Sequence, residues 1–136
     1  DTAVIATAFA KRGLIAEHGI AWMLPRVVGH ANATDLLLTS RKIDAAEALS
    51  LGLVNRVVPA DSLMEIAGQL ARLLSDEVSP RSVRIMKQQL WEAPFQSLGE
   101  AVTRANKEMV MSLQSADFKE GIAHFVERRP ARFQGC

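Results

Sequence analysis

The sequence is poor in cysteine, in histidine and in net charge, and each shortage excludes a class of protein. Among 136 residues there is one cysteine, Cys136, so no internal disulfide can form and a reducing cytoplasm is the expected location. One cysteine and three scattered histidines, His18, His30 and His124, cannot build a metal cluster, so no metal site is expected. The formal net charge is +1, which predicts neither nucleic acid nor a membrane as a partner.

Long apolar runs are also missing. The first ten residues are largely apolar, but they are too few to cross a bilayer and begin with Asp1 rather than with a basic segment, so no signal peptide is expected. The sequence does not begin with methionine, as in a chain cut from a longer protein. With 49% hydrophobic and 23% charged residues, the composition is that of a folded domain with one core.

The most informative acidic residue is Glu17, which lies between apolar residues in a short turn bracketed by Gly13 and Gly19. Beside apolar side chains a carboxylate loses hydration, which raises its pKa towards values useful for proton transfer. The positive end of a helix starting near Gly19 would instead favour the charged form, and the sequence leaves the balance open. An alternative interpretation is that Glu17 is only an N-terminal cap or a first-turn charge of that helix.

The residues before position 60 predict a mixture of short strands and helices. A strand is expected over 3–10, a helix over 20–28 that Pro25 interrupts or kinks, and a second helix over 32–40. A third helix starts at Asp44, with Glu47 in a capping-box arrangement, and ends at Gly52; a strand is expected over 54–58. This mixture favours an α/β architecture.

Beyond Pro59 the pattern becomes helical. Helices are expected from Asp61 to about Leu74, from Ser79-Pro80 to Pro94, over 97–114 and over 115–129, each with an apolar stripe. The simplest interpretation of these stripes is a packed core. Four helices nevertheless bring more apolar surface than one short sheet can cover, so a subunit interface is also expected.

Three blocks of sequence resemble the enoyl-CoA hydratase/isomerase (crotonase) family. They are residues 13–29 (GLIAEHGIAWMLPRVVG), 43–59 (IDAAEALSLGLVNRVVP) and 125–133 (FVERRPARF), in the family's order and spacing. The resemblance extends over nearly the whole chain and is to the family's C-terminal half. It implies the C-terminal part of a crotonase-like (ClpP/crotonase) α/β fold, with residues 1–59 in the core and 60–136 forming a helical region for trimerisation and coenzyme A (CoA) contacts.

The resemblance also implies an activity and the residues that serve it. Family members stabilise the enolate of an acyl-CoA thioester with two backbone N–H donors while carboxylates move protons. Glu17 matches the acid of isomerase-like members, and Leu14, Ile20 and Trp22 would line the acyl pocket. Phe125 and Arg128 match positions that contact CoA. No cofactor is implied beyond the CoA thioester substrate, and the implied assembly is a homotrimer or hexamer.

Two departures bear on the mechanism. Two-acid hydratases carry their second acid in the preceding strand, but residues 7–10 (TAFA) contain no carboxylate, which favours Glu17 as the sole proton-transfer residue from this half. The enolate-binding donors belong to the family's N-terminal half and have no counterpart in residues 1–136. An alternative to the enzyme is therefore a non-catalytic acyl-CoA-binding or helical assembly subunit.

Overall fold

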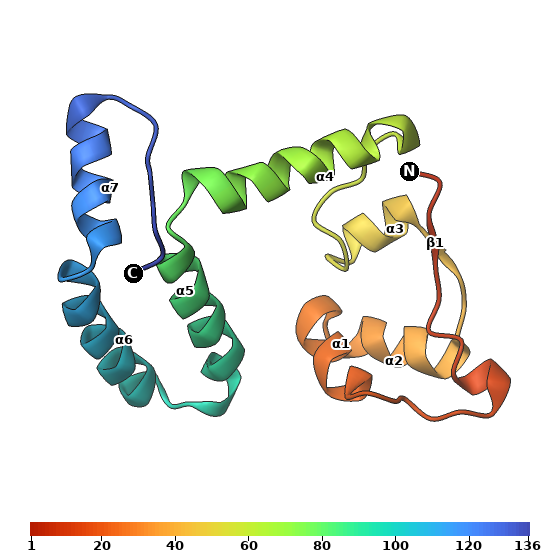
Figure 1. Cartoon of the computed structure of the whole chain (residues 1–136). Helices are drawn as coiled ribbons and strands as arrows, with labels where there is room; N and C mark the ends of the chain where they lie inside the picture. The colour runs from red at the N-terminus through yellow and green to blue at the C-terminus, as the bar shows by residue number, and fades with distance from the viewer. The chain divides into compact units, whose positions relative to one another are not determined.

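Two compact units, Asp1–Met64 and Glu65–Cys136, make up the computed structural model, which describes all residues from 1 to 136. The boundary falls inside helix α4 (Leu63–Arg72), so each unit is described separately (Figure 1). The functions predicted for residues 1–59 and 60–136 stay predictions.

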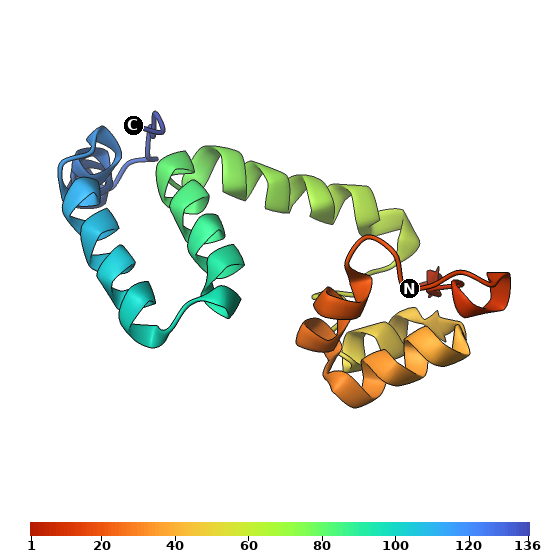
Figure 2. The ribbon, with the colours of Figure 1, turned by 90° about the horizontal axis from the view of Figure 1, so that it is seen from below.

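The first unit combines three helices with a small two-stranded sheet. Strand β1 (Val4–Ile5) pairs antiparallel with β2 (Ile43–Asp44), with Val4 opposite Asp44. The helices are α1 (Ile20–Val28), α2 (His30–Thr39) and α3 (Ala45–Ser50). Figure 2 shows this unit from below, with the short 3₁₀ turn Ala10–Arg12 between β1 and α1.

Both predicted strands need correction. The strand predicted over 3–10 stops at Ile5, because Ala8 takes a left-handed backbone (φ 58°) that an extended strand cannot contain. No strand forms over 54–58. Strand β1 pairs with β2 instead, and the carbonyl of Val58 accepts a hydrogen bond from the amino group of Asp1 at 2.9 Å.

The helices of this unit agree with the sequence more closely. Pro25 lies inside one continuous helix, α1, and does not divide it. Asp44 caps α3 as predicted, because its Oδ1 accepts the Glu47 N–H at 2.8 Å. The reciprocal half of the capping box is missing, since the Glu47 carboxylate accepts two hydrogen bonds from Arg41, at 2.6 and 3.0 Å.

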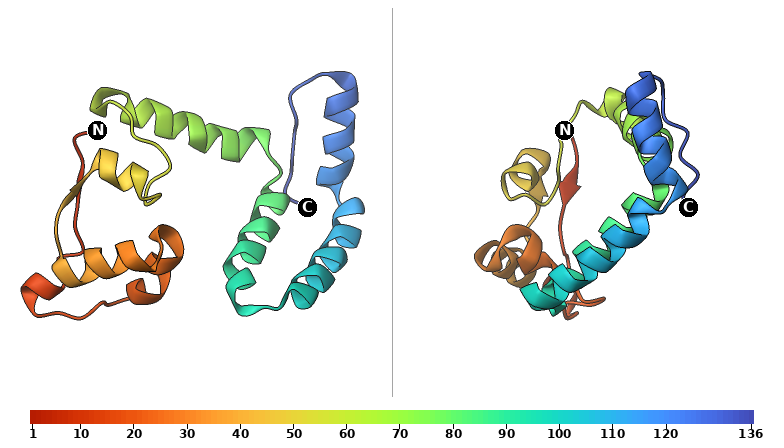
Figure 3. Two further views of the ribbon diagram at one scale, coloured as in Figure 1. Left: turned by 180° about the vertical axis from the view of Figure 1, so that it is seen from behind. Right: turned by 90° about the vertical axis from the view of Figure 1, so that its left-hand side faces the viewer.

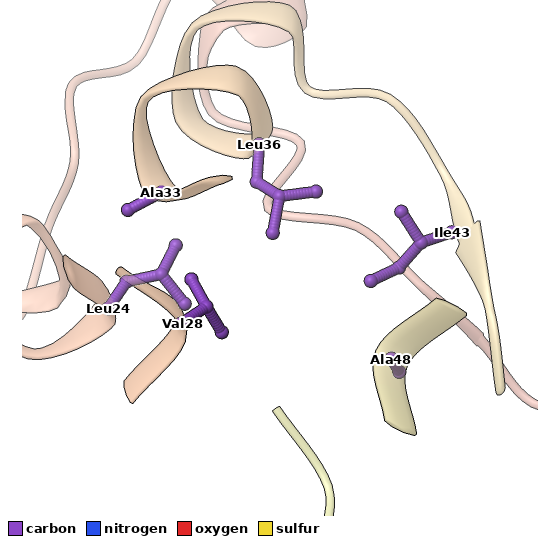
Figure 4. Close-up of a cluster of buried hydrophobic side chains, with 6 residues drawn as sticks. All are labelled: Leu24, Val28, Ala33, Leu36, Ile43 and Ala48. Carbon is purple, nitrogen blue, oxygen red and sulfur yellow. The ribbon is translucent and has the colours of Figure 1, made fainter. Parts of the chain in front are cut away.

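The core of the first unit forms where α1, α2, β2 and α3 meet. Figure 4 shows its six side chains, which converge from these four elements. They are Leu24, Val28, Ala33, Leu36, Ile43 and Ala48, each exposed by 5% or less. This cluster fixes the relative positions of α1 and α2, and therefore of the turn that precedes α1.

The second unit is entirely helical. After α4, a π-helical turn (Leu73–Glu77) leads into α5 (Pro80–Glu92), α6 (Leu98–Leu113) and α7 (Ala116–Glu127). The hydroxyls of Ser79, Ser97 and Ser115 cap the last three helices, and Ser97 and Glu100 complete a full capping box. Beyond α7 the chain turns back and runs to the start of α5 (Figure 3).

The two buried side chains of the second unit are polar. Ser79 donates a hydrogen bond to Asp117 at 2.5 Å, and Asp117 also accepts the backbone N–H groups of Gln134 and Gly135 at 2.8 and 3.0 Å. No hydrophobic residue of this unit is buried, so its stripes do not form a closed core within the chain. The exposed large members include Leu70, Leu90, Trp91, Phe95, Leu98, Val102, Met109, Leu113, Ile122, Phe125 and Val126.

Candidate functional site

Glu17 begins a tight turn that leads directly into α1. His18 and Gly19 both have positive φ angles, 54° and 77°, and the N–H of Ile20 donates to the Glu17 carbonyl at 3.0 Å, as in a type I′ turn. The helix N-cap is Gly19, and no side chain caps it. The cap interpretation of Glu17 is therefore wrong.

The Glu17 side chain lines an apolar cavity of about 390 Å³ in the first unit. The other lining residues come from β1 and the loop after it, α1, α2, β2 and the segment after α3: Ile5, Ala6, Thr7, Phe9, His18, Ile20, Leu24, Leu36, Ile43 and Leu53. Glu17 is the one carboxylate among them. The arrangement thus presents one carboxylate to a mainly apolar space, in which the His18 ring and the Thr7 hydroxyl are the other polar side-chain groups.

The Glu17 carboxylate is partly hydrated. Its side chain is 41% exposed, and its Oε2 lies 3.7 Å from Nε2 of His18, whose own side chain is 91% exposed. His18 is thus a solvated neighbour that pairs with Glu17 when protonated. The apolar neighbours of Glu17 within residues 1–136 therefore remove its carboxylate only partly from water.

A hydroxyl pair anchors the loop on another wall of the cavity. The Thr7 hydroxyl donates to the carbonyl of Leu36 at 2.9 Å, and Ser40 Oγ accepts the N–H of Ala10 at 3.1 Å. Ser40 is 2% exposed and lies at the C-cap of α2. These bonds hold the TAFA segment against α2 and place Thr7 and Phe9 at the cavity, where the segment contributes no acid.

The three predicted acyl-pocket residues lie in different surroundings. Ile20 lines the cavity, whereas Leu14 is 48% exposed and outside its lining. Trp22 is also outside the lining and stacks under the Arg26 guanidinium, which lies 3.6 Å from the ring centroid. Sequence reasoning missed Phe9, Leu24, Leu36, Ile43 and Leu53. Their apolar character gave only a core signal, because residues from separate elements meet here through tertiary packing.

The two predicted CoA-contact residues lie at the end of α7. Phe125 is 79% exposed, and Arg128 follows the helix in a left-handed conformation (φ 53°). Both line an open surface cavity of about 520 Å³ together with His124, Val126 and Arg129. The structure therefore brings Phe125 and Arg128 together, and their contact with CoA stays a prediction.

Arg129, which the sequence analysis did not single out, is held in an ion-pair network beside this cavity. Its Nη1 and Nη2 contact the two carboxylate oxygens of Glu120 at 2.5 and 2.8 Å, and its Nε contacts Glu127 at 2.5 Å. Hydrogen bonding from the Arg129 guanidinium lowers the pKa of Glu120 to about 2, despite partial desolvation. Arg129 is thus committed to protein carboxylates, whereas Arg128 belongs to none of the ion pairs.

Neither a metal-binding group nor a membrane-spanning helix is found in the structure. The described chain contains no group of three or more His, Cys, Asp or Glu side chains suited to holding a metal ion. None of its helices combines the length and the apolar character needed to span a bilayer.

Comparison with known proteins identifies the family. The family model described as "Enoyl-CoA hydratase/isomerase" matches residues 1–136, so the chain belongs to the enoyl-CoA hydratase/isomerase family. Crotonase-like structures share its fold. A probable enoyl-CoA hydratase/isomerase from Mycobacterium abscessus superposes with a TM-score of 0.93 at 32% identity, over 98% of this chain and 52% of that one. An enoyl-CoA hydratase from Bacillus anthracis gives 0.92 at 28% identity, covering 98% and 52%.

Curated relatives give the same family and a range of named activities. A probable enoyl-CoA hydratase of Mycobacterium bovis is 37% identical over 133 residues, which is 98% of this chain and 51% of the relative. A 1,2-epoxyphenylacetyl-CoA isomerase of Escherichia coli is 33% identical over 128 residues, covering 94% and 48%. The chain thus spans about half the length of these relatives, as expected for a match to the family's C-terminal half. Its mostly helical structure with two short strands agrees with that region.

Proposed function

We propose that this chain is part of an acyl-CoA-processing enzyme of the enoyl-CoA hydratase/isomerase type, with Glu17 as the proton-transfer residue. The observation that supports the proposal most directly is the position of Glu17 as the one carboxylate lining the apolar cavity. An acyl chain favours such a lining, and a carboxylate beside it is placed to exchange a proton with an acyl carbon.

The proposed chemistry uses a single acid. Ionised Glu17 removes a proton from C2 of a 3-enoyl thioester, and the electron pair of that C–H bond moves towards the carbonyl oxygen to give an enolate conjugated with the C3–C4 double bond. Backbone N–H donors from outside residues 1–136 stabilise the oxyanion, a contribution of about 3 kcal/mol per donor in comparable sites. Protonated Glu17 then gives the proton to C4, so that the double bond moves to C2–C3, the thioester carbonyl is restored and Glu17 is again a carboxylate.

The decisive experiment replaces Glu17 in the protein encoded by the complete reading frame that contains these residues. Glu17→Gln keeps the size of the side chain but cannot accept the proton, so kcat should fall about 1,000-fold while acyl-CoA affinity changes little. The assay follows the ultraviolet absorbance of the conjugated 2-enoyl thioester, which hydration removes and isomerisation from a 3-enoyl thioester creates.

The matched control is Asp61→Asn, an acid-to-amide change at an exposed position of the same unit that does not line the cavity. This variant should retain wild-type turnover. Full turnover by Glu17→Gln would refute the proton-transfer role. Calorimetry with an enoyl-CoA distinguishes the enzyme from a non-catalytic binding subunit. In the second case the unmodified protein would bind the thioester but would not convert it.

We further propose that residues 60–136 mediate a homotrimer or hexamer and contribute Phe125 and Arg128 to CoA binding. The exposed apolar stripes support an assembly, and the planar guanidinium of Arg128 suits a phosphate group. Sedimentation of the complete protein should show a species of three or six copies, and a monomer at micromolar concentration would refute the assembly. The cytoplasm and acyl-CoA metabolism are the proposed setting.

A further inference from the structure

The turn that ends α7 contains two adjacent arginines in different environments. Arg128 is exposed and belongs to none of the ion pairs, whereas Arg129 is half-buried. The Arg129 guanidinium donates to both carboxylate oxygens of Glu120, at 2.5 and 2.8 Å, and to Glu127 at 2.5 Å. A further N–H donates to the Pro130 carbonyl at 3.1 Å, so four of its five N–H groups are engaged. Arg129 therefore has little capacity left for a ligand.

The charges around Arg129 also argue against a direct role in anion binding. Two carboxylates, Glu120 and Glu127, contact its one guanidinium, so the group carries one net negative charge. The pKa of Glu120 is lowered to about 2, and its carboxylate therefore stays ionised at any pH used in an assay. A phosphate group would gain little from Arg129. The cation of this turn that has no acidic partner is Arg128.

The contact between Glu120 and Arg129 closes the turn in which Arg128 lies. Arg128 takes a left-handed conformation (φ 53°, ψ 43°), which is unfavourable for a residue with a Cβ atom. The chain reverses there, and the N–H groups of Arg128 and Arg129 both donate to the His124 carbonyl. Glu120 lies in α7, nine residues before Arg129, so its hydrogen bonds tie the chain beyond the turn back to the helix. The turn at Arg128 is thus held to α7 on both sides.

We infer that Arg129 is a positioning residue: its bonds to Glu120 hold the left-handed turn at Arg128. This turn keeps the Arg128 side chain in the same surface cavity as Phe125 and available to a phosphate group of CoA. The inference rests on the proposed CoA contact of Phe125 and Arg128, and it adds to that contact the residues that orient Arg128. Arg129 acts through Arg128 and does not touch the ligand.

The first test is Glu120→Gln in the complete protein, because two explanations predict opposite results. If Arg129 attracted CoA by its charge, removal of the acid that neutralises it would lower the KM for an enoyl-CoA. If Arg129 positions Arg128, loss of the two-point contact should raise that KM about 5-fold and leave kcat unchanged. A lowered or unchanged KM would overturn the inference.

A second substrate separates a positioning effect from a loss of folding. The same enoyl group on pantetheine keeps the thioester but lacks the adenosine phosphates of CoA. Glu120→Gln should leave kcat/KM for this thioester within about 2-fold of that of the unmodified protein. Equal losses with both substrates would show a general structural defect and would overturn the inference.

The matched control is Glu47→Gln in the first unit. Glu47 also binds an arginine, Arg41, through both of its carboxylate oxygens, but it does not line the cavity at the end of α7. This variant should leave the KM for both thioesters unchanged. A rise in the KM for the enoyl-CoA equal to that of Glu120→Gln would mean that any broken ion pair has this effect, and the inference would fail.

Arg129→Lys tests whether the shape of the guanidinium matters. Lysine keeps the positive charge but lacks the planar fork that contacts two oxygens at once. The variant should therefore raise the KM for the enoyl-CoA about as much as Glu120→Gln does. An unchanged KM would show that charge alone is required at position 129, and the positioning role would be refuted.

A double-variant cycle tests whether the effect passes through Arg128. Arg128→Gln alone should raise the KM for the enoyl-CoA about 10-fold, and an unchanged KM would refute the proposed CoA contact together with this inference. With Arg128 replaced, Glu120→Gln should add less than about a 2-fold change. If it still adds about 5-fold, Glu120 and Arg129 act by another route, so the inference fails while the CoA contact stands. Calorimetry with a saturated acyl-CoA repeats the cycle without turnover, and its result does not depend on Glu17.

Discussion

The two units differ in the kind of side chain that they bury. Residues 1–64 bury a cluster of apolar side chains centred on Leu24 and Leu36, whereas residues 65–136 bury only Ser79 and Asp117 and leave their apolar stripes exposed. Apolar burial is the main favourable contribution to folding. The first unit therefore contains its own source of stability. The second relies within this chain on capped helices and a polar anchor, and its apolar area is available for association.

The largest expected effect on stability comes from cutting into the apolar core of the first unit. Leu36→Ala leaves a cavity where a side chain was 4% exposed and should lower the free energy of unfolding of this unit by about 3 kcal/mol. Leu38→Ala, on the same helix but 74% exposed, should change it by less than about 0.5 kcal/mol. Hydrogen exchange of the α2 amides measures both, and equal effects would show that residues 1–64 have no core of their own.

The second expected effect, of nearly the same size, concerns the polar anchor of the other unit. Burial alone would raise the pKa of Asp117, but hydrogen bonds from Ser79 and from the backbone of Gln134, Gly135 and Arg81 outweigh it and lower that pKa. Asp117→Ala removes the shared acceptor and leaves its donors unpaired. The free energy of unfolding of this unit should fall by about 2–3 kcal/mol.

Exchange of the Gln134 and Gly135 amides is the direct readout for that variant, because both should lose protection. Asp117→Asn retains one carbonyl acceptor and should show an intermediate loss. Glu77→Ala, at an exposed acid of the same unit, is the control and should leave these amides protected. Unchanged protection in Asp117→Ala would mean that the tail is held by other contacts.

The smallest expected effect is the pH dependence of the stability of the second unit. The folded-state pKa of Glu120, about 2, lies below its ordinary value of 4.5, so its contribution to stability is present above pH 4.5 and is lost as the pH falls towards 2. Glu120→Gln should therefore flatten the fall in thermal midpoint over this interval. Glu77→Gln should leave the slope as in the wild type, and an unchanged slope in Glu120→Gln would contradict the assignment.

The sequence predicted the helices better than the strands because helices are decided locally. The Ser79-Pro80 start of α5 and the Asp44 cap of α3 depend on residues within one turn, and both formed as expected. Whether a segment becomes a strand depends on which other segment it pairs with, and that segment can lie far away in the sequence. The residues 54–58 have a strand-like composition, but β1 found its partner at Ile43–Asp44, and the left-handed Ala8 ended β1 early.

For the candidate site, the sequence indicated the acid but not most of the apolar residues around it. The glycine-bracketed turn pointed to Glu17, and the structure places Glu17 and Ile20 at one cavity. Leu24, Leu36 and Ile43 were recognisable only as apolar residues, because no local pattern shows that α1, α2 and β2 converge there. The Asp117 anchor was equally hidden, since its partners, Ser79 before α5 and Gln134 in the C-terminal tail, lie 38 and 17 residues away from it along the chain.

The left-handed pair His18-Gly19 has a mechanical consequence for Glu17. Only these two residues separate Glu17 from the first residue of α1, and the bond from the Ile20 N–H to the Glu17 carbonyl closes the link at 3.0 Å. The backbone position of Glu17 is therefore set by the start of α1, and a change in the turn residues would move the acid relative to that helix.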